Sequence, residues 1–332
     1  MILGRLPFIY SLEKVLNTKL YLVGGAVRDL LLNTPIKDFD FTCPLSPDEI
    51  EKRITSIGKK AYTVGKKFGT IGFNFESIFV EVTTFREEQY SKDSRKPAIK
   101  FVEDLKEDLS RRDFTINALA MDSSGKIYDY FGGQKDIEDG VLRAIGNVEK
   151  RFSQDPLRML RAARFASEYN LSIEQKTKET ILEKYYLLVN ISKERWVEEL
   201  DKILASDNVL AGMDLLMDLR IFNVICPELT LQKDFYQSNP FHDFTLWENT
   251  KKVVATIPKQ DLDLRWAALL YNIAKPFTRT KNKKECSNYV AHNLVGSDMA
   301  MRLCKHLKFS NKRIDFIVST IKDSSVLFTT IC

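Results

Sequence analysis

The chain has 332 residues, of which 44% are hydrophobic, and a formal net charge of +5 at pH 7. This length exceeds one ordinary domain and predicts two or three folded units with apolar cores. Five scattered cysteines without a C-x-x-C pair favour free thiols in a reducing cytosol over zinc or disulfides. No stretch approaches the roughly 18 apolar residues of a membrane span, and the N-terminus lacks an apolar signal region. We therefore expect a soluble, cytoplasmic protein with no membrane partner. The modest positive charge does not by itself establish RNA binding.

The first strong pattern in the chain is KLYLVGGAVRDLLLN at residues 19–33. A short apolar strand leads into Gly24 and Gly25, and a helical pattern that carries Arg28 follows. Glycines at a strand-to-helix turn let backbone N–H groups approach a phosphate closely, and the N-terminus of the helix adds positive potential. The pattern therefore predicts a phosphate-binding turn.

Three carboxylates follow on two predicted strands. Asp38 and Asp40 in KDFDF share one face because side chains on a strand repeat every two residues, and Glu81 lies in IFVEV on what we expect to be the neighbouring strand. Clustered carboxylates repel one another unless a cation compensates them, and Mg²⁺ prefers oxygen ligands. The pattern predicts a Mg²⁺ site. The alternative for the DFD sequence alone is a solvated strand edge.

The sequence GGxVRDxLL followed by DxD resembles motif A of the class II tRNA nucleotidyltransferase and bacterial poly(A) polymerase family, which belongs to the polymerase β superfamily. Further segments resemble later family motifs in the family's order. They are EVTTFR (81–86), DLSRRDFTINALAMD (108–122), YDYFGGQKDIEDGVLRAIG (128–146), RFSQDPLRMLRAARFA (151–166) and ISKERWVEELDKIL (191–204). The order of the segments makes coincidence improbable.

The resemblance and the sequence pattern together imply an α+β protein. Short β-branched and aromatic runs alternate with a few helices before residue 140, and helical spacing dominates after it. We expect a polymerase β-like nucleotidyltransferase head with a mixed sheet at residues 1–140. An all-α neck that recognises the nucleotide base is expected at 141–205, and an all-α body with a degenerate HD-like region and tRNA contacts at 206–332.

The resemblance also implies roles for the head residues. Nucleotidyl transfer attacks an α-phosphate with an RNA 3′-hydroxyl and expels pyrophosphate, which a two-metal site can promote. Asp38 and Asp40 are expected to hold Mg²⁺, and Glu81 to complete the catalytic set. Arg111 and Arg112 offer planar forks suited to triphosphate oxygens, and Asp113 could accept a hydrogen bond from a ribose hydroxyl. The alternative for this Arg-Arg-Asp run is a surface salt bridge.

Base selection is expected at Asp155 and Arg158. A carboxylate beside a guanidinium matches the donor and acceptor shared by cytosine and adenine, and it mismatches guanine and uracil. The family's motif is Glu-Asp-x-x-Arg, and here Gln154 replaces the glutamate. The alternative for Asp155, which precedes Pro156, is a helix N-cap, and both roles can coexist. Arg161 and Arg164 are also predicted to bind the nucleotide. The alternative is that they continue a solvated basic stripe along the helix.

Residues 239–300 resemble the HD phosphohydrolase region of many bacterial relatives, but the metal ligands are degraded. Asn249 stands where the first histidine is expected, Tyr271 and Asn272 stand where the His-Asp pair is expected, and only His292 remains. The chain contains only two other histidines, His242 and His306. We expect no HD metal centre, and a helical scaffold in its place.

The sequence therefore predicts a Mg²⁺-dependent enzyme that adds CMP and AMP to the 3′ end of tRNA. Its expected partners are tRNA, CTP and ATP, with no DNA, and its oligomeric state is open. Poly(A) polymerases and enzymes restricted to adding A or CC share the head motifs. The predicted polar loop 86–100 looks full length, which favours CCA or A addition over CC addition. A catalytically dead RNA-binding or scaffold protein is the alternative from another class.

Overall fold

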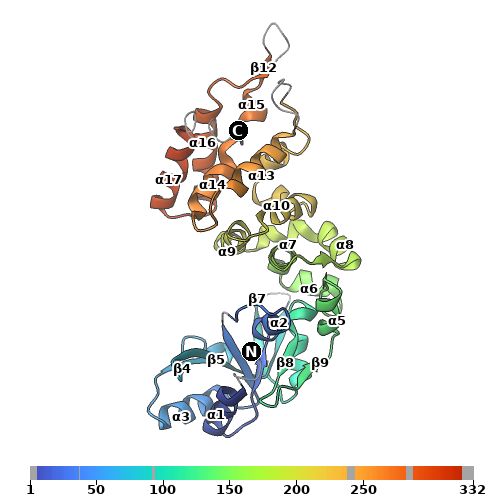
Figure 1. Cartoon of the computed structure of the whole chain (residues 1–332), viewed down its shortest axis with the longest axis vertical. Helices are drawn as coiled ribbons and strands as arrows, with labels where there is room; N and C mark the ends of the chain where they lie inside the picture. Colours follow the sequence, from blue (N-terminus) through green and yellow to red (C-terminus); the bar gives the residue numbers. More distant parts are fainter. Residues whose placement is uncertain (1–5, 37, 92–93, 238–243, 282–286, 324–332) are drawn as a thin grey trace. The chain divides into compact units, whose positions relative to one another are not determined.

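The structure, a computed structural model, describes residues 6–36, 38–91, 94–237, 244–281 and 287–323 (Figure 1). The chain forms two compact units. The first comprises Met1–Gln154 with Ser172–Thr177, and the second comprises Asp155–Leu171 with Lys178–Cys332. The division into head, neck and body at residues 140 and 205 remains a prediction.

The first unit is built on a seven-stranded sheet with strand order β3-β4-β5-β2-β1-β8-β9. Strands β2 and β5 are parallel, and the other neighbouring pairs are antiparallel. This mixed sheet confirms the predicted class of head. The strands are β1 (Tyr21–Val23), β2 (Phe39–Cys43), β3 (Ala61–Tyr62), β4 (Thr70–Phe75), β5 (Ile78–Thr84), β8 (Leu119–Met121) and β9 (Ile127–Asp129).

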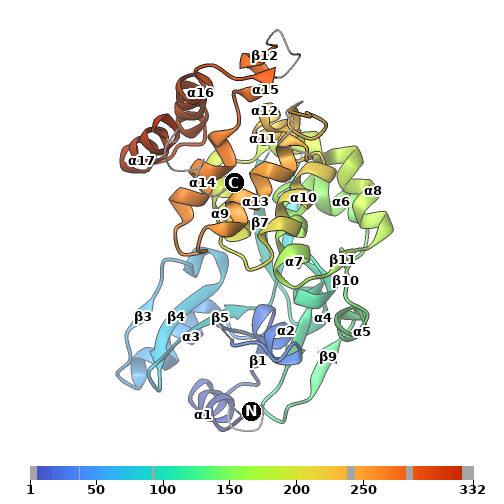
Figure 2. The same cartoon turned by 45° about the horizontal axis from the view of Figure 1, so that its top comes forward.

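One face of this sheet packs on helices α1 (Leu6–Leu16) and α3 (Pro47–Ser56) (Figure 2). Phe41, Phe73 and Val80 point into this core from three adjacent strands. Helix α3 begins at a capping box in which Ser46 and Glu49 exchange side-chain and backbone hydrogen bonds. Because successive residues of a strand alternate between faces, the side chains at positions 40, 79 and 81 lie on the opposite face.

Residues 86–91 and 94–101 form the two paired strands of a β-hairpin, so the prediction of a polar loop at 86–100 was wrong. Strand β6 (Arg86–Ser91) pairs antiparallel with β7 (Ser94–Phe101). Glu87 lies opposite Lys100 and forms an ion pair with it at 3.0 Å. Opposite charges that face each other across two strands stabilise a hairpin. The sequence of this hairpin lacks the alternation of apolar and polar residues from which strands are predicted.

Short elements complete the first unit. They are α2 (Gly25–Leu31), η1 (Lys66–Phe68), α4 (Leu105–Ser110), η2 (Thr115–Asn117), α5 (Gly133–Glu138), β10 (Val141–Leu142), α6 (Val148–Gln154) and β11 (Ser172–Ile173). Strand β10 pairs in parallel with β11, and this pairing brings residues 172–177 into the first unit.

The second unit is almost entirely helical, as predicted. Its main helices are α7 (Leu157–Glu168), α8 (Gln175–Lys184), α9 (Lys193–Leu204), α10 (Val209–Asp218), α13 (Leu246–Thr256), α14 (Leu262–Tyr271), α16 (His292–His306) and α17 (Asn311–Lys322). Shorter pieces are η3 (Tyr185–Asn190), α11 (Phe222–Ile225), α12 (Pro227–Thr230) and α15 (Lys275–Thr278), with strands β12 (Thr280–Lys281) and β13 (Ser287–Asn288). Between β12 and β13, residues 282–286 lie outside the described part of the chain.

Helix α9 shows how the second unit is held together. Ser192 occupies the N-cap position of this helix, although its side chain makes no capping hydrogen bond. Trp196 is fully buried and donates from Nε1 to the carbonyl of Leu188 at 3.1 Å. None of the helices that the structure describes is both long enough and apolar enough to cross a membrane.

Candidate active site

Asp40 and Glu81 lie on the face of the head sheet opposite α1 and α3, and Asp38 lies next to them in the chain segment that leads into β2. Asp40 in β2 and Glu81 in β5 are register partners on adjacent parallel strands. Asp38 lies just before β2 and is exposed. Burial raises the pKa of Asp40, and the charges of Glu81 and Asp38 raise it further. The structure therefore brings the three carboxylates into one electrostatically coupled group.

Arg112 lies beside this acidic group. Its positive charge opposes the rise in the pKa of Asp40, while burial lowers the pKa of Arg112 itself. The fully buried Asp108 lies between the two neighbouring arginines, because it accepts from Nε of Arg111 at 3.0 Å and lies 3.9 Å from a terminal nitrogen of Arg112. Asp108 thus holds two arginines, of which Arg112 acts on the carboxylate group, and Asp108 was absent from the predicted set of site residues.

The glycine turn also meets Arg112. Gly24 has φ +67°, a conformation that side chains disfavour, and a Cβ atom there would lie 2.5 Å from a terminal nitrogen of Arg112. Helix α2 begins at Gly25, the next residue. The glycine at position 24 is required both by the backbone and by the space that the guanidinium occupies.

Arg28 and Asp113 are bound within a buried network. Arg28 donates to Asp29 at 2.8 Å and to Oδ1 of Asn117 at 2.5 Å, and Asn117 donates to Asp113 at 3.0 Å. Asp113 also accepts from the backbone N–H of Phe114 at 2.9 Å. These contacts give both residues a structural role in fixing α2 against η2. Asn117 was absent from the predicted set, and only its place in the DLSRRDFTINALAMD segment pointed to it.

The predicted base-reading residues belong to the second unit and flank the start of α7. The carboxylate of Asp155 accepts from the backbone N–H of Leu157 at 3.3 Å and from Arg195 at 3.3 Å. Arg158 is 6% exposed. Asp155 therefore supports the N-terminus of α7, and its other oxygen carries an ion pair to α9.

Arg161 and Arg164 converge on Glu199, a residue of α9 that is only 3% exposed. Nε of Arg164 lies 2.6 Å from Glu199, and Arg161 lies 3.9 Å from it. The Arg164 guanidinium also lies 4.0 Å from the centre of the Phe165 ring. These contacts join α7 to α9, so the arginines are not a simple solvated stripe. The sequence offered no sign that Glu199 is buried.

The head carboxylates suit a divalent cation that is completed by other ligands. Among the residues that the structure describes, no three His, Cys, Asp or Glu side chains are grouped closely enough to enclose a metal ion. Mg²⁺ commonly binds one or two protein carboxylates together with waters and substrate phosphates. The mutual repulsion of Asp38, Asp40 and Glu81 is the kind of stress that such a cation relieves.

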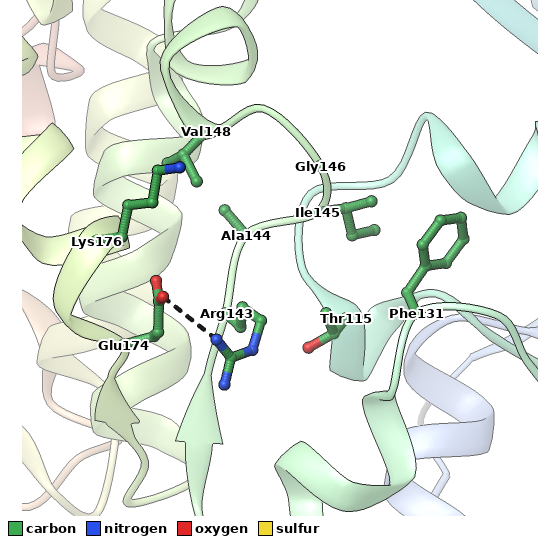
Figure 3. Close-up of a pocket in the computed structure, with 9 residues that line it drawn as sticks. All are labelled: Thr115, Phe131, Arg143, Ala144, Ile145, Gly146, Val148, Glu174 and Lys176. Atoms are coloured by element: carbon green, nitrogen blue, oxygen red, sulfur yellow. Dashed lines mark ion pairs between the residues drawn. The ribbon is translucent and has the colours of Figure 1, made fainter.

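A cavity of about 230 Å³ lies elsewhere in the first unit, beside β10 and β11 (Figure 3). Arg143 on its wall pairs with Glu174 at 3.2 Å and with Asp136 at 3.1 Å. Thr115, Phe131, Ile145 and Lys176 also line it. None of the predicted site residues is among those lining it, so the cavity is separate from the acidic group.

The degenerate HD positions lie together in the second unit. The buried amide of Asn272 donates to Oδ1 of Asn249 at 3.2 Å and to the hydroxyl of Thr250 at 3.0 Å. The rings of Tyr271 and His292 are 5.6 Å apart. Burial lowers the pKa of His292, and its Nδ1 lies 2.9 Å from the carbonyl oxygen of Tyr289. His242 lies outside the described residues, and His306 is exposed at the end of α16, as expected for a surface residue.

The fold and the carboxylate group define a polymerase β-like nucleotidyltransferase head. Residues 20–143 match the family model described as the poly A polymerase head domain, and residues 170–232 match the one described as a probable RNA and SrmB-binding site of polymerase A. A crystal structure of the Bacillus stearothermophilus CCA-adding enzyme in complex with CTP has a similar fold. The TM-score is 0.68 at 29% identity, covering 96% of this chain and 69% of that one.

Two curated relatives carry the same name. The CCA-adding enzyme of Staphylococcus epidermidis is 38% identical over 265 residues, which are 78% of this chain and 63% of that protein. The CCA-adding enzyme of Enterococcus faecalis is 45% identical over 213 residues, which are 64% of this chain and 51% of that protein. The chain belongs to the family of bacterial poly(A) polymerases and tRNA nucleotidyltransferases. It spans less than two thirds of the length of these two relatives.

Proposed function

We propose that this chain adds CMP and AMP to the 3′ end of tRNA without a nucleic-acid template and releases pyrophosphate. The observation that carries the proposal is the pairing of Asp40 with Glu81 on adjacent strands, with Asp38 and Arg112 beside Asp40. Relatives and a similar structure named CCA-adding enzyme support the choice of substrate. A cytoplasmic location is part of the proposal, and DNA and membranes are not among the proposed partners.

Asp38 and Asp40 are proposed to hold Mg²⁺, which supplies Lewis acidity and neutralises the charge that develops on the reacting oxygens. Glu81 is proposed to face the attacking 3′-hydroxyl. The guanidinium of Arg112, held by Asp108, provides fixed positive charge where triphosphate oxygens enter. Arg28 acts behind this layer, because its hydrogen bonds go to Asp29 and Asn117.

Base choice is proposed for Asp155 and Arg158 on the second unit. Arg195 contacts Asp155 and can hold its carboxylate in one orientation. In the family motif, the glutamate that Gln154 replaces here is expected to orient Arg158 in a comparable way. A carboxylate acceptor beside a guanidinium donor accepts cytosine and adenine and leaves guanine or uracil with unpaired polar groups. Arg161 and Arg164 are proposed to support this site, since both lie against Glu199.

The deciding experiment incubates purified protein and Mg²⁺ with tRNA that ends at the discriminator base. CTP alone, ATP alone and both together are supplied, and the products are sequenced. Complete CCA ends with both nucleotides support the proposal. Addition of A only or CC only identifies a restricted enzyme, and long A tracts identify a poly(A) polymerase. Binding of tRNA without any addition overturns the enzymatic proposal in favour of an RNA-binding protein.

A further inference from the structure

A single row of paired residues crosses four strands of the head sheet. Asp40 in β2 pairs with Glu81 in β5, Glu81 pairs with Gly72 in β4, and Gly72 pairs with Tyr62 in β3. Paired residues on adjacent strands point to the same face of a sheet. The row therefore leads from the proposed catalytic carboxylates outward to Tyr62 on β3, the edge strand of the sheet.

A second aromatic side chain lies beside Tyr62 on the same face of the sheet. Phe79 lies two residues before Glu81 on β5 and so shares its face. The rings of Tyr62 and Phe79 are 5.9 Å apart at 60°. A Cβ atom at Gly72 would lie 2.8 Å from Cζ of Phe79, so the glycine makes room for the ring to lie across the strand.

Both rings are accessible, unlike the aromatic side chains on the other face. Tyr62 is 41% exposed and Phe79 is 50% exposed, whereas Phe41 and Phe73 are buried against α1 and α3. Two adjacent exposed rings cost free energy, because apolar surface is favourably removed from water. The packing of the core does not require this exposure. Their position beside the carboxylates indicates a ligand with planar apolar faces.

The charges around the two rings favour a polyanion. The ammonium group of Lys60 lies 5.2 Å from the centre of the Tyr62 ring. Lys67 in η1, which precedes β4 in the chain, lies in the same way 5.0 Å from the centre of the exposed Phe68 ring, outside the Tyr62 and Phe79 pair. Aromatic side chains with flanking lysines on an open sheet face are typical of surfaces that stack the bases of single-stranded nucleic acid and contact its phosphates.

We propose that Tyr62 and Phe79 form a stacking platform for the unpaired bases at the 3′ end of the RNA substrate. This proposal rests on the proposed function, because it assigns the platform to the RNA whose 3′-hydroxyl is presented to Glu81 and Asp40. Tyr62 lies two strand spacings from Glu81, about 10 Å, and Phe79 lies about 7 Å along the strand from it. Stacking at these positions fixes the terminal nucleotides beside the reacting group without reading their sequence.

The test measures RNA binding directly, by fluorescence anisotropy without nucleotide triphosphates. The probes are labelled tRNAs ending at the discriminator base, with either a normal or an abasic 3′-terminal nucleotide. Phe79→Ala and Tyr62→Ala are expected to raise the Kd of the normal RNA about tenfold each, the scale of one lost base stack. The abasic RNA should bind the unmodified protein with a similarly raised Kd, and the variants should bind it no more weakly.

Two controls separate stacking from structure. Phe79→Tyr keeps a planar ring and should restore binding, whereas Tyr10→Ala removes an exposed ring from α1 on the covered side of the sheet and should change nothing. Equal losses for normal and abasic RNA, or no loss with either alanine variant, overturn the platform. Failure of the unmodified protein to extend tRNA in a parallel assay contradicts the proposed function instead, and the two failures are thus distinguishable.

Discussion

Asp40 and Glu81 lie side by side on the parallel strands β2 and β5, the one parallel pair in the described seven-stranded sheet. Burial and the neighbouring carboxylates raise the pKa of Asp40. A carboxylate held ionised at neutral pH in this position therefore opposes folding of the head. The arrangement therefore lowers the stability of the head, and a bound divalent cation would offset this loss.

The first prediction concerns Asp40→Asn. Removing the charge should lower nucleotidyl transfer about a thousandfold or more, the scale expected for loss of a group that stabilises transition-state charge. The same change should raise the thermal midpoint of unfolding at pH 7. Glu138→Gln, an exposed carboxylate at the end of α5, should alter neither quantity. Near-normal transfer by the Asp40 variant would exclude the acidic group as the active site.

The predicted direction of the change in stability caused by Asp40→Asn can be checked by varying the pH. The pKa of Asp40 is higher in the folded protein than its ordinary value of 3.8, so the folded state favours the protonated form. The destabilising effect of Asp40 is therefore complete at pH above the folded pKa and absent below about pH 3.8. Urea unfolding of Asp40→Asn and the unmodified protein should show a difference at pH 7 that shrinks as the pH falls. A difference that grows in acid would show that Asp40 is stabilised as a carboxylate.

The second prediction separates the two roles of Asp155. Pro156 occupies the N-cap position of α7, and Asp155 accepts from the backbone N–H of Leu157. Because an amide oxygen also accepts, Asp155→Asn should keep this hydrogen bond while removing the carboxylate that pairs with Arg195. We expect discrimination of CTP against UTP to fall about tenfold, with thermal stability nearly unchanged. Asp155→Ala should lose both the hydrogen bond to Leu157 and the ion pair to Arg195. It should therefore lower the discrimination against UTP and also reduce the free energy of unfolding by about 1 kcal/mol. Unchanged nucleotide ratios in competition assays with both variants would reduce Asp155 to a helix cap.

Prediction from the sequence was most successful for features that follow from the local periodicity of apolar residues. The alternation in the DFD segment correctly placed Asp40 and Phe41 on opposite faces of the sheet, although Asp38 lies just outside β2, and the apolar runs indicated β1, β2 and β5 before their pairing was known. The hairpin β6–β7 was missed because its stabilising pairs, such as Glu87 with Lys100, are polar and leave no alternation of burial.

Roles that depend on distant contacts could not be read from the sequence. Arg28 resembled a phosphate ligand, but its hydrogen bond to Asn117 joins residues 89 positions apart. The burial of Glu199 between two arginines likewise follows only from the packing of α7 on α9. Charged residues are usually exposed, so a buried one is seen only when the tertiary structure supplies its partners.

The third prediction tests that buried charge. Glu199→Gln should lower the free energy of unfolding by about 3 kcal/mol, because it leaves the cations of Arg161 and Arg164 without their shared carboxylate. Glu198→Gln, at an exposed neighbouring position on the same helix, should change it by less than about 0.5 kcal/mol. Urea unfolding followed by circular dichroism measures both. Equal effects of the two substitutions would show that the ion pairs to Glu199 contribute nothing beyond a surface charge.

The fourth prediction is that the degenerate HD region has no phosphohydrolase activity. Asn272 is bound to Asn249 and Thr250, and an asparagine amide is a poor metal ligand compared with the imidazole and carboxylate groups of a working centre. The Nε2 atom of the half-buried His292 is itself buried and has no hydrogen-bond partner within the described part of the chain, so it is the atom at which an unusual metal centre could begin. Added Ni²⁺, Mn²⁺ or Mg²⁺ should produce no 2′,3′-cyclic phosphodiesterase or phosphatase turnover.

The matched variants are His292→Ala and Asn272→Ala. His292→Ala should leave both the metal content and the nucleotidyl transfer rate of the purified protein unchanged. Asn272→Ala should instead destabilise the second unit by about 1–3 kcal/mol, because the half-buried amide oxygen of Asn249 and the buried hydroxyl of Thr250 lose a donor. Asn223→Ala, an exposed asparagine on α11, provides the baseline for stability. Metal-dependent hydrolysis that disappears with His292→Ala would establish a surviving metal centre, and the helical region would then be an enzyme in its own right.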